Sequence, residues 1–138
     1  MRLDTKQKVL IAIYTEYQKD IPDMRNAIKA NLLGIENQAF CVAIEKLENE
    51  RLIKGSSITK AKGRALAIYT DGIMMTPEGI EYVENKLGIE KSMSGIEKVH
   101  EMAKKSATWG WNEFKDITVK VLSEMGKHGI DKILGSGE

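Results

Sequence analysis

Hydrophobic residues in the N-terminal third of the chain recur at intervals of three and four, the spacing that gives a helix one buried face. Asp4 and Gln7 have the spacing of a capping pair, so a first helix is expected to begin there and to end near Tyr17. Pro22 interrupts the pattern. A short second helix should follow, ending at Gly34, with these inward-facing residues: Met24, Ala27, Ile28 and Leu32.

The pattern changes after a third helix, which is predicted from about Asn37 to Asn49. Residues 56–60 are small or β-branched and predict a strand, and residues 61–64 predict a turn. A second extended stretch should lie within residues 66–75, with an interruption at Asp71-Gly72. Thr76 and Pro77 then provide a cap and a first-turn proline for a fourth helix. The predicted order is helix, helix, helix, strand, turn, strand, helix.

Two stretches carry a family resemblance. Residues 43–53, AIEKLENERLI, resemble the junction at which the third helix of a winged-helix domain enters its first strand. Residues 75–83, MTPEGIEYV, resemble the exit from the wing into a helix. Together they resemble the YjcQ-like winged-helix family of Gram-positive bacteria and their phages. The resemblance implies an α+β, mostly α, winged-helix domain over residues 1–88, comprising three helices, a β-hairpin wing and a fourth helix. By analogy with other winged helices, it also implies DNA binding.

The wing carries the clearest local charge. The whole chain has a net charge of only +1, but the segment from residue 51 to residue 64 contains no acid and these cations: Arg51, Lys54, Lys60, Lys62 and Arg64. In a winged helix such a segment reaches DNA phosphates. The alternative is a solvated edge hairpin whose lysines prevent pairing with other strands.

The third helix has the opposite charge. The segment from Glu36 to Glu50 holds four glutamates and one lysine, a local charge of −3 that would weaken phosphate binding. Asn37 and Gln38 are residue types that pair with adenine edges, although a cap and an exposed amide explain them equally well. An acidic third helix is also typical of winged helices that bind proteins.

Two functions therefore remain open. The first is a small transcriptional regulator of bacterial, phage or prophage origin that binds double-stranded DNA. The second is a phage or mobile-element accessory protein that uses the same scaffold to bind and inhibit, or recruit, a host protein.

A hinge over residues 89–94 is expected to lead into a helical tail over residues 95–138. Three roles for this tail are open: packing on its own domain or on a second copy, docking of a partner, and lying on a membrane surface. Its balanced charge disfavours the membrane, and a homodimer is expected. The residues proposed for this interface are Trp109, Trp111, Phe114, Ile117, Val121 and Met125.

Recognisable catalytic chemistry is missing from the sequence. Cys41 is the one cysteine, which excludes an internal disulfide and is typical of a reducing, cytoplasmic location. His100 and His128 lack neighbours at metal-ligand spacing, and Lys62-Gly63-Arg64 lacks the glycines of a phosphate-binding loop. No signal peptide or membrane-spanning segment is visible. We therefore expect a soluble protein without enzymatic activity, cofactor or metal.

Overall fold

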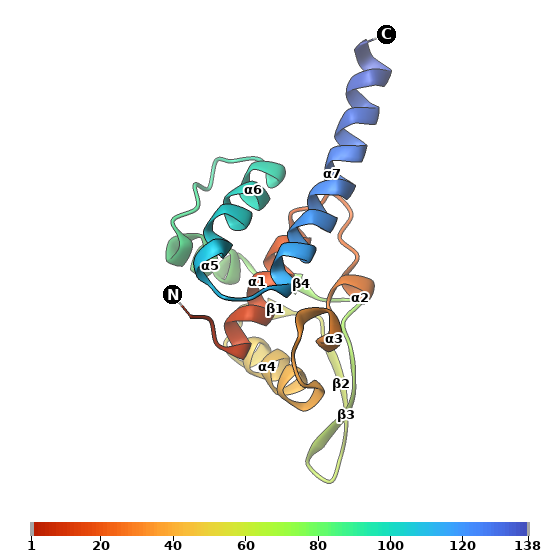
Figure 1. Ribbon diagram of the computed structural model, residues 1–138. Coiled ribbons are helices and arrows are strands. Elements are labelled where there is room, and N and C mark those ends of the chain that lie inside the picture. Colours follow the sequence, from red (N-terminus) through yellow and green to blue (C-terminus); the bar gives the residue numbers. More distant parts are fainter. Residues whose placement is uncertain (1, 138) are drawn as a thin grey trace.

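The computed structural model describes the backbone of residues 2–137 and the side chains of residues 2–63 and 67–126 (Figure 1). N-terminal helices are followed by short strands and then by a further helix, as predicted, and the chain continues into a helical tail. The elements are α1 (Thr5–Tyr17), α2 (Met24–Ala27), α3 (Ala30–Leu33), α4 (Asn37–Asn49), β1 (Ile53–Lys54), β2 (Ser57–Ala61), β3 (Arg64–Tyr69), β4 (Met74–Met75), α5 (Pro77–Leu87), α6 (Gly95–Lys105), a 3₁₀ turn η1 (Ser106–Thr108) and α7 (Glu113–Gly137).

Helix α1 is the centre of the molecule. Every residue from Val9 to Glu16 is buried, because α4, α5, α7 and β4 pack around it. The capping pair predicted at its start is present: the Asp4 carboxylate accepts from the Gln7 N–H at 2.8 Å, and the Asp4 N–H donates to the Gln7 side chain at 2.9 Å. Apolar residues on all sides of a helix are typical of a core element rather than a surface one.

The four strands form one long hairpin in two antiparallel sections. Near its base Ile53 pairs with Met75, and farther out Ser57 pairs with Tyr69. The sections meet where Gly55 passes Gly72 so closely that a Cβ on Gly55 would lie 1.9 Å from the Gly72 carbonyl oxygen. Position 55 therefore requires glycine, because any side chain there would clash with the opposite strand. The predicted interruption of the second extended stretch at Asp71-Gly72 is confirmed.

This arrangement is a winged-helix fold, with α4 as the third helix and β2–β3 as the wing. The second helix departs from the prediction, because it is split into α2 and α3 by extended backbone at Ile28 and Lys29. The Thr70 hydroxyl donates to the Met24 carbonyl at 3.2 Å and lies 3.5 Å from that of Ile28, so the wing base satisfies carbonyl groups at the break. Leu33 is buried in place of the predicted Leu32, which is 43% exposed.

The tail helices share the core of the winged helix. Met102, Trp109, Trp111 and Phe114 belong to the same buried cluster as α1 and α4, and Ile89 from the expected hinge joins them. The Trp111 indole N–H donates to the Leu33 carbonyl at 2.9 Å. The tail therefore contacts α3 directly and stabilises its position.

The proposed interface role is consequently wrong for four of the six tail residues. Trp109, Trp111, Phe114 and Val121 are each at most 5% exposed within a single chain, because packing against their own domain already covers them. Ile117 is partly buried against the same core, and Met125 is half-buried. Packing on its own domain, one of the alternatives left open for the tail, is what the structure shows for these side chains.

Ion pairs made by two largely buried lysines reinforce this packing. Lys98 on α6 donates to the Glu84 carboxylate on α5 at 2.6 Å, and the same carboxylate accepts from the Tyr14 hydroxyl at 2.8 Å. Lys19, after α1, contacts both Glu16 at 2.9 Å and Glu124 on α7 at 3.1 Å.

Within the described part of the chain, no helix is long and apolar enough to cross a membrane.

Candidate nucleic-acid interface

The wing projects beyond α4 at one end of the molecule, opposite the end at which α7 extends (Figure 1). Lys60 and Lys62 are exposed on it, and Lys62 occupies the tip with a positive φ of 54°. Arg64 begins β3, but its side chain lies outside the described residues. Lys54 is exposed on β1 at the base of the hairpin, and Arg51 is exposed in the turn that leaves α4. The structure thus places Lys60 and Lys62 on the wing and separates Lys54 and Arg51 from its tip.

The basic wing and the acidic α4 contact each other directly. Lys60 Nζ lies 2.5 Å from Glu45 Oε2. Closer to the base, the Glu48 carboxylate accepts from the Ser56 N–H at 2.8 Å and from the Ser56 hydroxyl. The two opposite charges seen in the sequence therefore partly neutralise each other within the molecule.

The other two glutamates of this segment also have internal roles. Glu36 is the N-cap of α4 and accepts from the N–H groups of Gln38 and Ala39 at 3.0 and 2.9 Å. Glu50 pairs with Lys6 on α1 at 2.7 Å. The acidity of α4 is therefore largely explained by contacts within the chain, and it no longer argues specifically for a protein partner.

Asn37 and Gln38 are placed differently from each other. Because Glu36 is the N-cap, Asn37 occupies the first position of α4 with an exposed side chain. Gln38 is half-buried. Of this pair, Asn37 lines a groove between the broken second helix, α4 and β3, and Gln38 does not.

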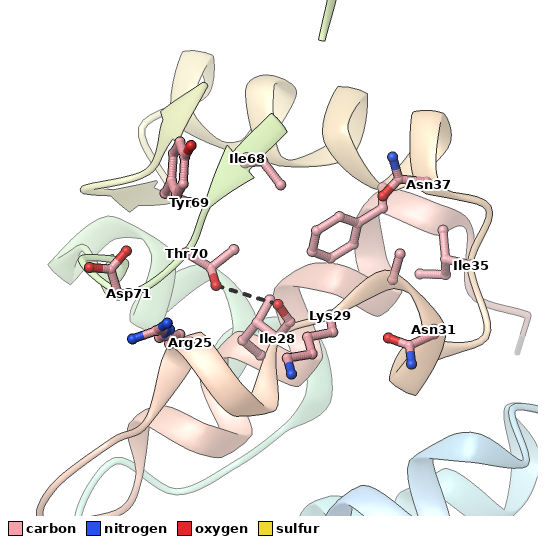
Figure 2. A pocket seen from close by; sticks show the side chains of 12 residues that line it. Arg25, Ile28, Lys29, Asn31, Ile35, Asn37, Ile68, Tyr69, Thr70 and Asp71 are labelled. Atoms are coloured by element: carbon pink, nitrogen blue, oxygen red, sulfur yellow. Dashed lines mark hydrogen bonds between the residues drawn. The ribbon is translucent and has the colours of Figure 1, made fainter. Parts of the chain in front are cut away.

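A groove with a volume of about 760 Å³ lies between the broken second helix, the start of α4 and the end of β3 (Figure 2). The wall on the wing side carries Tyr69 and Asp71, whereas Asn31, Ile35 and Asn37 stand across from them (Figure 2). Arg25 and Lys29 flank the opening. The groove therefore borders both the start of α4 and the end of β3, which belong to the third helix and the wing of the fold.

Sequence reasoning missed Arg25, Lys29, Asn31 and Tyr69. Arg25 and Lys29 are four residues apart within the segment predicted to be helical, a spacing that places two cations on one face. This spacing can be read from the sequence. The helix break beside the groove cannot, because it is stabilised by Thr70, which lies far along the chain.

Other candidate chemistry is weak. Burial, with smaller contributions from Glu45 and Glu36, raises the pKa of the Cys41 thiol, which disfavours the reactive thiolate. Among the described residues, no group of three or more His, Cys, Asp or Glu side chains could hold a metal ion.

Comparison with protein families identifies a match over most of the chain. A family model described as YjcQ protein matches residues 7–104, which is more than half of the chain. The matched region extends through most of α6, so it includes part of the tail that shares the core. This confirms the resemblance predicted from the two sequence stretches. No curated protein and no solved structure matches the chain.

Proposed function

Since the chain belongs to the YjcQ family and has a winged-helix fold, we propose that it binds double-stranded DNA. The wing would contact phosphates, and the start of α4 would enter the major groove. The observation that carries this proposal is the hairpin that projects beyond the helical body (Figure 1) and includes the exposed residues Lys60 and Lys62.

The charge distribution supports the proposal. Lys54 and Lys62 are exposed, and no ion-pair partner is found for either among the described residues. Repulsion between neighbouring cations falls when an anion binds, and a phosphate backbone supplies anions at regular intervals. The four glutamates of the segment from Glu36 to Glu50 already have roles within the chain. Glu36 caps α4, and the other three contact Ser56, Lys60 and Lys6.

Salt dependence of binding to a random duplex tests the proposal. Each phosphate contact contributes about 0.9 to the slope of log K against log salt concentration. The variant Lys60→Ala/Lys62→Ala/Arg64→Ala should therefore bind all sequences more weakly and have a slope that is shallower by about 2.7. Fluorescence anisotropy over a series of salt concentrations measures both quantities.

A matched control is Lys91→Ala/Lys104→Ala/Lys115→Ala, which removes the same charge from exposed positions away from the wing. Its affinity should stay closer to that of the wild type. Equal losses in both variants would mean that net charge, not the wing, attracts the DNA. Complete absence of salt-sensitive binding in the wild type would overturn the proposal.

A host protein is the alternative partner. Affinity capture from a bacterial lysate separates the two functions when half of the sample is treated with nuclease. Recovered DNA, lost from the wing variant but not from its control, supports the proposal. A stoichiometric protein that survives nuclease treatment and is lost in the wing variant would replace it.

A further inference from the structure

The groove between α3, α4 and β3 has the dimensions of a small-molecule site. Its volume of about 760 Å³ falls within the range of pockets that bind organic ligands, roughly 300–1,000 Å³. The inner surface is apolar and consists of Ile28, Ile35, Phe40 and Ile68. Ile28 and Phe40 are each 2% exposed, so these two residues form a packed floor.

The opening of the groove has the opposite character. Arg25 and Lys29 are both exposed, and neither has an ion-pair partner among the described residues. Asp71 is the one acid that lines the groove. An apolar floor beneath two available cations and one carboxylate complements a molecule that has an apolar body and an anionic end.

From this geometry we infer that the groove binds a small amphipathic anion, a compact aromatic or branched apolar body that carries one carboxylate, sulfonate or phosphate. The apolar body lies on Ile28, Phe40 and Ile68, and the anionic group lies between Arg25 and Lys29. Asn31 and Asn37 stand at the rim as amide hydrogen-bonding groups.

A pair of fluorescent probes tests this assignment. The anionic probe is 8-anilinonaphthalene-1-sulfonate, and the neutral probe is N-phenyl-1-naphthylamine, which has nearly the same rings without the sulfonate. The full chain should bind the anionic probe at one site with higher affinity. The probe should shift the NMR amide signals of Ile28, Asn31 and Tyr69.

Two variants locate the site. Arg25→Ala/Lys29→Ala should weaken the anionic probe about fivefold and leave the neutral probe unchanged, because each partly exposed ion pair contributes modestly. Lys91→Ala/Lys104→Ala, with the same change of charge elsewhere, should bind both probes as the wild type does. Asn31→Trp, at an exposed rim position, should obstruct both probes, and circular dichroism checks that it folds.

Four results would overturn the inference. Three are signal shifts outside the groove, equal weakening by the two double variants, and equal affinity of the wild type for the two probes. Probe binding that competes with an oligonucleotide but is unaffected by Arg25→Ala/Lys29→Ala would also overturn it, because the shared site would then lie elsewhere.

Regulation of DNA binding by this ligand rests on the proposed function. An anion held between α3, α4 and β3 adds negative charge beside the DNA-facing elements, so saturating probe should raise the Kd for a duplex. The two hypotheses fail separately. Probe binding without any DNA binding would contradict the proposed function alone, whereas DNA binding without probe binding would contradict the ligand site alone.

Discussion

Lys60 on the wing and Glu45 on α4 form an ion pair at 2.5 Å, which joins the most basic segment of the chain to the most acidic one. The pair has two consequences. It holds the wing against the third helix, and it withdraws one of the wing cations from a phosphate partner. Both side chains are substantially exposed, 51% for Lys60 and 30% for Glu45, so DNA can compete with the pair.

Glu45→Gln should therefore strengthen DNA binding. The substitution releases Lys60 and removes one acid from α4, and we expect the Kd for a random duplex to fall about two- to fivefold. The free energy of unfolding should change by less than about 1 kcal/mol, because the pair is exposed. Anisotropy and urea unfolding measure these effects.

The matched control for this change is Glu81→Gln, because Glu81 is also exposed and pairs with a lysine, Lys91, at 3.9 Å, but lies on α5. It should leave the DNA affinity nearly unchanged. The role given to the Lys60–Glu45 pair would be refuted if both variants tightened binding equally.

Lys98→Ala should destabilise the protein by about 3 kcal/mol, because it removes the cation from the buried Glu84 carboxylate, which is 2% exposed. Lys104→Ala is the comparison, since Lys104 is 75% exposed and its loss should cost less than about 1 kcal/mol. Urea unfolding supplies both values. The double variant Glu84→Gln/Lys98→Met should recover part of the loss, and a failure of Lys98→Ala to exceed Lys104→Ala would contradict the stated role.

Trp111→Phe should destabilise the protein more than Trp109→Phe does, by about 1–2 kcal/mol. Both indoles are nearly buried and pack on Phe114, but only Trp111 donates to a main-chain carbonyl, that of Leu33. The first substitution leaves this carbonyl without its donor. Thermal unfolding of the two variants gives the comparison, and equal midpoints would show that the hydrogen bond contributes little.

Stability should fall at high pH through Tyr14. Burial, together with the hydrogen bond to Glu84 and its negative charge, raises the pKa of Tyr14 far above its ordinary value of 10.0. Above that pH the unfolded chain loses the phenol proton while the folded chain keeps it. The unfolded state then binds fewer protons, so the free energy of unfolding decreases as pH rises, by about 1.4 kcal/mol per pH unit.

Tyr14→Phe should remove this contribution and flatten the decline between pH 10 and pH 11. Tyr69→Phe provides the control, because it removes the same hydroxyl from a tyrosine whose side chain is 56% exposed. Denaturant unfolding at several pH values measures the slopes. Parallel slopes for wild type and Tyr14→Phe would exclude Tyr14 as the source.

Features that depend on neighbouring residues were predictable from the sequence. The Asp4–Gln7 capping pair and the Thr76-Pro77 helix start depend on groups within one helical turn, so their residue types announce them. The strands and the interruption at Asp71-Gly72 followed from similar local patterns, whereas the winged-helix fold was implied by the resemblance of two stretches to a known family. The lysines at positions 54, 60 and 62 of the predicted basic segment are exposed, and their contact with DNA stays a prediction.

Features that depend on distant partners required the tertiary structure. A helical stripe that includes Phe114 and Ile117 predicts burial but does not specify what covers it, and here the covering surface is part of the chain's own core. The break at Ile28 depends on a hydroxyl from Thr70, and the groove exists because of that break. The sequence by itself determined the scaffold and its charged segments. Only the tertiary structure decided which charged residues form ion pairs, because the contact of Glu45 with Lys60 depends on how the wing packs beside α4.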